Sequence, residues 1–121
     1  MRRSIAVPAV LATCLFFAAC GDDDSDAPAG DAAPKVIEVT IQDGTVTPNG
    51  ERVELERGQD VEFLMDADEA GELHVHTDGE GQTLPYNKGV STLELALEES
   101  PGRIEVETHD PDVVVVLLEI R

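Results

Sequence analysis

The three histidines are the side chains of this chain that are best suited to chemistry. His74 and His76 lie two apart in a segment, residues 72–78, in which apolar and polar side chains alternate. If the segment is a β-strand, this spacing places both imidazoles on one face, about 6.6 Å apart along the strand. His109 ends a second alternating segment, residues 103–109. Three imidazoles on two strands predict a shared metal site, and the alternative is a set of solvated surface histidines.

Acidic residues flank the histidines on both segments. Neutral imidazole suits Cu(II), Zn(II) and Ni(II), and the usual affinity order places Cu(II) first. We therefore expect Cu(II), or another divalent transition metal, to be bound by His74, His76 and His109. Four carboxylates are expected to orient the imidazole rings or to act as further ligands: Glu72, Asp78, Glu107 and Asp110.

The first 20 residues have the layout of a secretory signal. An arginine pair precedes an apolar run, residues 5–17, that is too short for a membrane span of about 20 residues. Residues 17–20, Phe-Ala-Ala-Cys, resemble a bacterial lipobox, whose cysteine becomes lipidated. We expect a lipoprotein signal peptide at residues 1–19, and a lipid on Cys20 that anchors the chain on the extracytoplasmic face of a bacterial cell membrane. An ordinary signal peptide cut near Cys20 is the alternative.

Cleavage before Cys20 would leave 102 residues with a strong negative charge. All 26 acidic residues and six of the eight basic ones follow residue 19, so the formal charge becomes −20. Such a surface repels nucleic acid and favours cations and basic partners. Residues 20–34 begin with Cys20 and continue with small, acidic and proline residues only, so we expect a disordered tether there. With Cys14 removed and Cys20 lipidated, the domain that follows has neither a free thiol nor a disulfide.

Residues 35–121 are predicted to form one all-β domain. Runs of alternating apolar and polar side chains are separated by turn residues, and residues 79–89 are expected to form a loop. Seven or eight short strands with turns about every 8–12 residues predict an antiparallel β-sandwich. The expected strands are residues 35–42, 45–47, 52–57, 60–65, 72–78, 90–97, 103–109 and 113–120. The expected core contains Val39, Val53, Phe63, Leu73, Val75, Leu95, Ile104 and Val106.

Four motifs in a fixed order give the domain a resemblance to a known family. They are Val-Thr-Pro-Asn-Gly at 46–50, Arg-Gly-Gln-Asp at 57–60, Glu-Leu-His-Val-His at 72–76 and Ser-Pro-Gly-Arg-Ile-Glu-Val-Glu at 100–107. The domain resembles the cupredoxin-like domains of bacterial exported lipoproteins, including the type attached to iron-uptake proteins. This resemblance implies a Greek-key β-sandwich in which the strand of His74 and His76 and the strand of His109 lie in the same sheet.

The resemblance does not extend to a type 1 copper site. Such a site uses two histidines, one cysteine and a weak axial ligand such as methionine. The resemblance places the position of the cysteine at Thr108, and residues 110–116 contain no histidine or methionine. Only His74 therefore matches the type 1 pattern, and we expect neither a blue centre nor type 1 electron transfer.

Together these features predict a lipid-anchored, cupredoxin-like protein that binds a transition metal, copper in preference, outside the cell. No nucleophile–base pair, phosphate-binding loop or distinct carboxylate pair is evident in the sequence, so we do not expect an enzyme. The alternative is a metal-free β-sandwich that serves as an interaction module at the cell surface.

Overall fold

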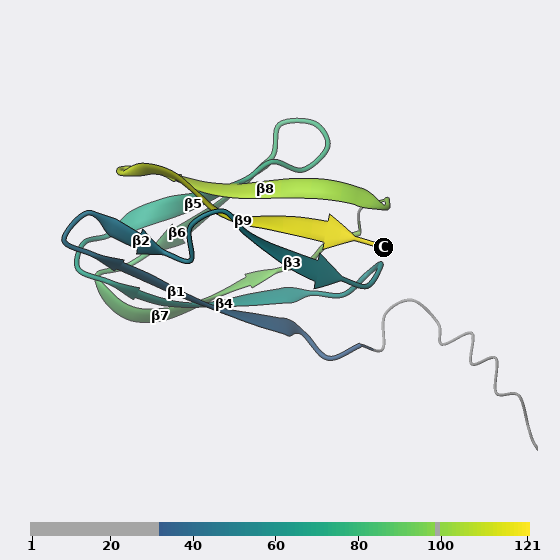
Figure 1. Cartoon of the computed structure of the whole chain (residues 1–121). Coiled ribbons are helices and arrows are strands. Elements are labelled where there is room, and N and C mark those ends of the chain that lie inside the picture. The colour runs from purple at the N-terminus through teal and green to yellow at the C-terminus, as the bar shows by residue number, and fades with distance from the viewer. Residues whose placement is uncertain (1–31, 99) are drawn as a thin grey trace, which may run out of the picture.

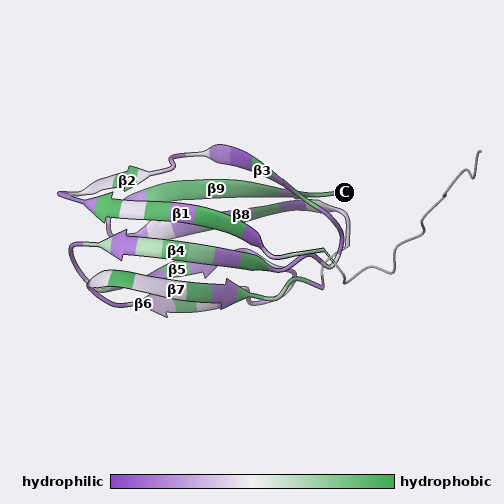
Figure 2. Cartoon of the chain, turned by 90° about the horizontal axis from the view of Figure 1, so that it is seen from below, coloured by the Kyte–Doolittle hydropathy of each residue, from purple (hydrophilic) through white to green (hydrophobic). Residues whose placement is uncertain are grey.

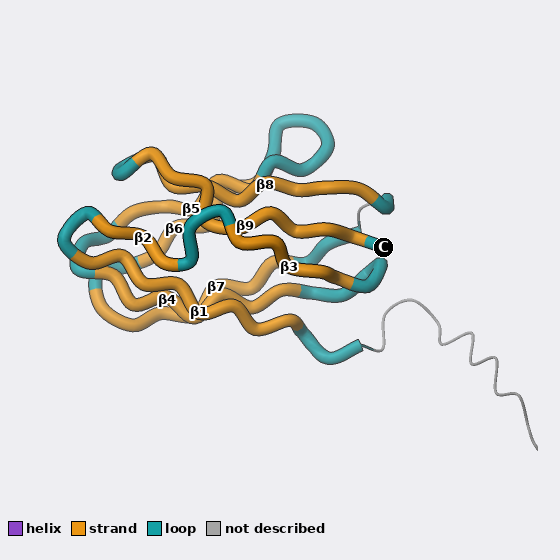
Figure 3. Tube along the Cα trace, in the orientation of Figure 1, coloured by secondary structure: helices purple, strands orange, loops and turns teal. Residues whose placement is uncertain are grey.

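The computed structural model describes residues 32–98 and 100–121 (Figure 1). The predicted signal peptide, the predicted lipid site at Cys20 and most of the predicted tether lie outside these residues. Within them every regular element is a strand, as Figure 3 shows. In this part of the chain, no helix is long and apolar enough to cross a membrane. The predicted all-β fold is confirmed.

The strands form two sheets that face each other as two layers (Figure 1). The four-stranded sheet has the order β2-β1-β4-β7, and the five-stranded sheet has the order β3-β9-β8-β5-β6. The described residues thus contain nine strands, rather than the seven or eight expected. Their bounds are β1 Lys35–Gln42, β2 Thr45–Thr47, β3 Glu51–Leu55, β4 Val61–Ala67, β5 Gly71–Val75, β6 Gln82–Tyr86, β7 Gly89–Leu95, β8 Gly102–His109 and β9 Asp112–Ile120.

The core lies between the sheets and is made of alternate residues of each strand. In β4, Val61, Phe63, Met65 and Ala67 are buried, whereas the residues between them are exposed or partly exposed. Figure 2 shows the same alternation as green and purple bands along the strands. Seven of the eight expected core residues are buried, and Val53 is partly buried against the same cluster. Alternation with a period of two is therefore sufficient to predict which face of each strand is buried.

Two of the strand pairs are parallel, which corrects the expectation of a purely antiparallel sandwich. β1 runs parallel to β4, and β3 runs parallel to β9. The physical reason is the route of the chain: between β1 and β4 it passes through β3 in the other sheet. Such a crossover allows two strands of one sheet to run in the same direction, whereas a tight hairpin does not.

Residues 79–89 are not the loop that we expected, because Gln82–Tyr86 form strand β6. This strand pairs antiparallel with β5, with Leu73 opposite Leu84. Pro85 obscures the strand in the sequence, but proline is tolerated on an edge strand, and β6 is the edge of its sheet. The β5–β6 turn needs a glycine at position 81, where φ is +75° and a Cβ would lie 2.8 Å from the Val75 carbonyl oxygen.

A β-bulge lies on the pairing of β8 with β9, beside Glu107. Val106 is opposite Val116 and Glu107 is opposite Val114, so Val115 is the extra residue. Both Val115 and Val116 are buried as a result. The bulge bends the ladder locally, as bulges commonly do next to functional sites.

We predict that Phe63→Ala will destabilise the domain severely. Phe63 is fully buried between the sheets, so truncation removes apolar contacts and leaves a cavity, at a cost of about 3–5 kcal/mol in the free energy of unfolding. Val90, which is 83% exposed, provides the control. Val90→Ala should change the same free energy by less than about 0.5 kcal/mol. Urea denaturation followed by circular dichroism measures both, and equal losses would contradict the assigned core.

Candidate functional site

Strands β5 and β8 are neighbours in the five-stranded sheet and carry the three histidines to one face. His74 lies directly opposite Glu107, and Val75 lies opposite Val106. The amide N–H of His76, just beyond the end of β5, donates to the Glu105 carbonyl over 2.9 Å. Because Val75 and Val106 are buried, their neighbours His74 and Glu107 must point out of the sandwich. The expectation that both histidine strands lie in one sheet is confirmed.

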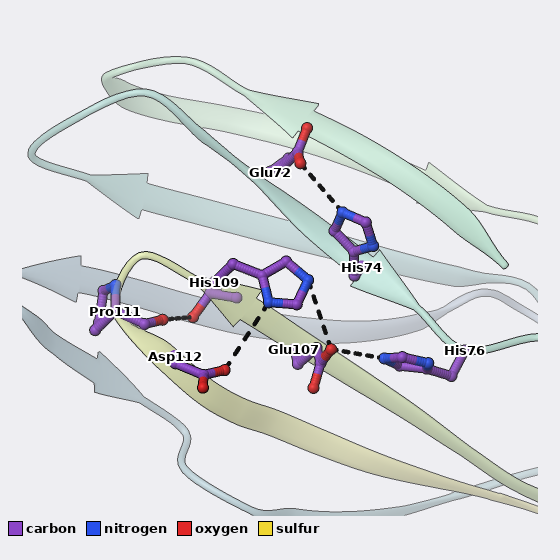
Figure 4. Close-up of polar contacts among 8 residues, drawn as sticks. Glu72, His74, His76, Glu107, His109, Pro111 and Asp112 are labelled. Carbon is purple, nitrogen blue, oxygen red and sulfur yellow. Dashed lines mark hydrogen bonds and ion pairs between the residues drawn. The ribbon is translucent and has the colours of Figure 1, made fainter.

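Glu107 stands between two of the imidazoles (Figure 4). His76 Nε2 lies 2.7 Å from Glu107 Oε1, a short hydrogen bond in which the imidazole N–H donates. His109 Nε2 lies 3.6 Å from the same oxygen atom. One oxygen of Glu107 is thus approached by two ring nitrogens. One belongs to His76, which follows β5, and the other to His109, at the end of β8.

His74 joins this group through His109. The two rings are packed edge to face, with their centroids 4.5 Å apart and their planes at 62°. His74 Nε2 is directed away from Glu107 and lies 3.1 Å from Glu72 Oε1 (Figure 4). The structure therefore brings the three predicted histidines together with Glu107, in the group that we call the histidine cluster: His74, His76, His109 and Glu107.

The flanking acidic residues differ in what they contact. Glu72 and Glu107 each contact a histidine, as expected. Within the described residues, Asp78 and Asp110 form no ion pair with a histidine: β5 ends at Val75, before Asp78, and Asp110 lies in the turn after β8. Asp112 was not predicted to lie near a histidine, but its Oδ1 is 3.9 Å from His109 Nδ1. The register of β8 with β9 places it opposite His109, and side-chain alternation along one strand does not indicate this contact.

In their present positions the side chains do not form a metal site. Among residues 32–98 and 100–121, no group of three or more His, Cys, Asp or Glu side chains is arranged to hold a metal ion. The reason is visible in the contacts, since each imidazole is paired with a carboxylate. Metal binding here requires the rings to turn away from their carboxylates and toward one point.

A type 1 copper site does not fit the residues that are present. Thr108, at the position where the family resemblance places the cysteine, is 1% exposed. Its hydroxyl donates to the Pro111 carbonyl over 2.6 Å, which closes the turn after β8. A threonine hydroxyl supplies no thiolate, so this position serves the fold rather than a blue centre.

The surroundings of Glu107 lower the pKa of its carboxyl below the ordinary value. The hydrogen bond from His76 is the largest cause; partial burial acts in the opposite direction, and the charges of His76, His109 and His74 lower the pKa further. Glu107 is therefore held as a carboxylate, which keeps a negative charge at the centre of the histidine cluster.

No protein-family model matches the sequence, and a search of curated proteins finds no match. Among solved structures, the chain is similar to the blue copper oxidase from Nitrosomonas europaea, with a TM-score of 0.51 and 13% identity over 73% of this chain. The chain spans only 44% of the length of that oxidase.

Two other solved structures are similar to the chain. A mutant of amicyanin with Cu(I) has a TM-score of 0.49 and 16% identity, over 78% of this chain and 88% of that one. A multicopper oxidase has a TM-score of 0.48 and 15% identity, over 78% of this chain and 45% of the oxidase. At these identities the likeness concerns the fold alone, and the match to the blue copper oxidase supports a cupredoxin-like fold.

We predict that Glu107 contributes to stability at neutral pH and that this contribution is lost in acid. A carboxyl whose pKa is lowered by folding stabilises the protein above its unfolded pKa of about 4.5, and the effect disappears as pH falls through the folded value. Glu107→Gln should therefore lower the free energy of unfolding by about 1 kcal/mol at pH 7 and by progressively less below pH 4.5.

Denaturation of the parent and of Glu107→Gln at a series of pH values measures this difference. Glu38→Gln removes an exposed carboxylate from β1 in the other sheet and is the control. If the difference in the free energy of unfolding between the parent and Glu107→Gln increased as the pH fell, Glu107 would not be held as a carboxylate by the histidines.

Proposed function

We propose that this chain is a lipid-anchored, non-enzymatic, cupredoxin-like protein that binds a divalent transition metal outside the cell. The proposed ligands are His74, His76 and His109, and Cu(II) is the favoured metal. One observation carries the proposal: the Nε2 atoms of His76 and His109 both approach the same Glu107 oxygen, at 2.7 and 3.6 Å. The third imidazole packs against His109.

The histidine cluster offers a donor set that suits copper without a thiolate. Imidazole nitrogens and a carboxylate oxygen are ordinary ligands of Cu(II), which stands above Zn(II) in the affinity order for such sites. A carboxylate held as an anion beside the rings orients them and raises their basicity. The acidic surface of the chain, with a formal charge of −18, adds a general attraction for cations.

Metal binding would replace interactions that the histidines already make. The hydrogen bond from His76 to Glu107 would be exchanged for coordination of the same ring nitrogen. Coordination also requires a neutral imidazole, so affinity should fall as the pH drops below about 6. A site that must first break hydrogen bonds binds its metal less tightly than one with free ligands, which favours a role in buffering or handling copper.

A metal-free interaction module is the second candidate function. It is favoured by the pairing of each imidazole with a carboxylate, because in this arrangement the described residues contain no group of three or more ligands that could hold a metal ion. In that case the histidine cluster serves as a polar surface on the β5–β8 face of the sandwich. The copper titration below separates the two functions.

We predict that residues 32–121, which contain both sheets and the whole described core, bind one Cu(II) ion and give a protein without intense blue colour. Single changes of His76 or His109 to alanine should weaken binding by at least about tenfold, and so should Glu107→Gln. The histidine variants should still fold, because these side chains point away from the core. His76→Ala should lower the free energy of unfolding by no more than about 1 kcal/mol, since it removes the hydrogen bond to Glu107. Isothermal calorimetry and visible absorption measure the two effects.

Glu38→Gln is the matched control for the copper titration, since it removes a carboxylate from the other sheet. If the variant with all three histidines changed to alanine binds copper as tightly as the parent, the acidic surface is the binder and the proposed site is wrong. If the parent binds no copper, the interaction module is the better account.

We further predict that Cys20 carries the lipid anchor. Cys20→Ser, made in the full chain and expressed in a bacterium, should give an uncleaved or soluble protein that leaves the detergent phase on phase partitioning. Cys14→Ser is the control, because Cys14 lies within the predicted signal peptide and would be removed with it. Equal detergent partitioning of Cys20→Ser and the parent would rule out the anchor at this residue.

A further inference from the structure

An acidic cavity of about 430 Å³ lies at one end of the sandwich, separate from the centre of the histidine cluster. It lies where the β1–β2 turn, the β4–β5 loop and the β8–β9 turn meet, with the end of β6 beside them. His109 is its most basic lining residue, and no lysine or arginine lines it. Five carboxylates surround the cavity: Asp43, Asp68, Glu69, Glu72 and Asp110.

The side chain of Tyr86 extends into this cavity from β6. Tyr86 is only 5% exposed, and a Cβ at position 71 would clash with its hydroxyl, so Gly71 is what allows the ring to stand there. No hydrogen bond joins this hydroxyl to another described residue, and the hydroxyl oxygen is not fully buried: among these residues Ser91 Oγ is the one buried side-chain polar atom without a partner. The hydroxyl faces the cavity and is therefore open to a hydrogen-bonding partner from outside the chain.

The electrostatics of the cavity indicate the sign of that partner. Burial is the largest cause that raises the pKa of the Tyr86 phenol above its ordinary value, and the charges of Asp110, Asp68 and Glu72 raise it further. The hydroxyl thus stays neutral in a strongly negative field. A cation placed in the cavity would be attracted by the same carboxylates.

The size of the cavity and the spacing of its carboxylates favour an organic cation over a metal ion. A volume of about 430 Å³ is within the range of small-molecule sites. The carboxylates are contributed by separate turns and strands, and within the described residues they do not converge into a group that could hold a metal. A molecule with several N–H donors can reach carboxylates at separate positions, as a bare ion cannot.

We propose that this cavity binds a small organic cation that bears ammonium or guanidinium groups. Its N–H groups donate to Asp68 and Asp110, and the Tyr86 hydroxyl, with its ring beside the charge, completes the site. Asp68 is already positioned, since its Oδ2 accepts the N–H of Asp43 over 2.7 Å. The proposal does not rest on metal binding by the histidine cluster, although His109 lines both sites.

The test uses the full chain in detergent at low ionic strength, titrated with spermidine as a free amine and with trilysine as a basic peptide. Tyr86 is the only tyrosine and the chain has no tryptophan, so the intrinsic fluorescence reports on this site directly. We expect saturable binding that weakens with added salt. We expect the double change of Asp68 and Asp110 to asparagine to weaken binding at least about tenfold.

Tyr86→Phe, measured by calorimetry, should weaken binding several-fold, and the asparagine variants keep the test valid if that variant fails to fold. Glu38→Gln, which lies outside the cavity and in the other sheet, should bind as the parent does. Binding of spermidine alone assigns the site to free amines, and binding of trilysine alone assigns it to a basic protein segment. Absence of binding by both probes, or equal binding by the parent and the asparagine variants, would overturn the proposal.

Discussion

The candidate site depends on the pairing of β5 with β8. Each of these strands buries one face in the core, so the other face must point outward. Leu73 and Val75 on one strand, and Val106 and Thr108 on the other, close the core. Their neighbours are thereby forced outward, and this brings the imidazoles to Glu107. A register slip of one residue would send a histidine into the core and a valine to the surface, so the apolar contacts of the core also fix the geometry of the histidine cluster.

The period of side-chain alternation was enough to predict most of the fold. It identified buried residues such as Phe63 of β4 and Ile104 and Val106 of β8, because each apolar face has to be covered. It could not predict β6, since Pro85 breaks the pattern that marks a strand. Nor could it predict the parallel pairs, because strand direction depends on which sheet the chain crosses into rather than on any local sequence.

The candidate site was predictable only in part: its three histidines were predicted, and the contacts that depend on turns and loops were not. The spacing of His74 and His76 predicts that these two share a face, whereas the placement of His109 in the same sheet was implied only by the resemblance to cupredoxin-like domains. The ion pair with Asp112 depends on a turn, and the cavity around Tyr86 depends on three loops that meet only in the folded chain. Spacing along one strand carries no information on such contacts. The proposal of copper as the favoured metal rests on ligand chemistry alone, since the available donors are imidazole and carboxylate.

The central claim is that three imidazoles on two strands act as one ligand set. Pulsed electron paramagnetic resonance of residues 32–121 loaded with one equivalent of Cu(II) tests this most directly, because the spectrum reports the imidazole nitrogens that are bound to the metal. Our account predicts couplings from more than one imidazole, with fewer in His76→Ala and in His109→Ala. A spectrum without imidazole couplings, or one that is the same when all three histidines are changed to alanine, would contradict it.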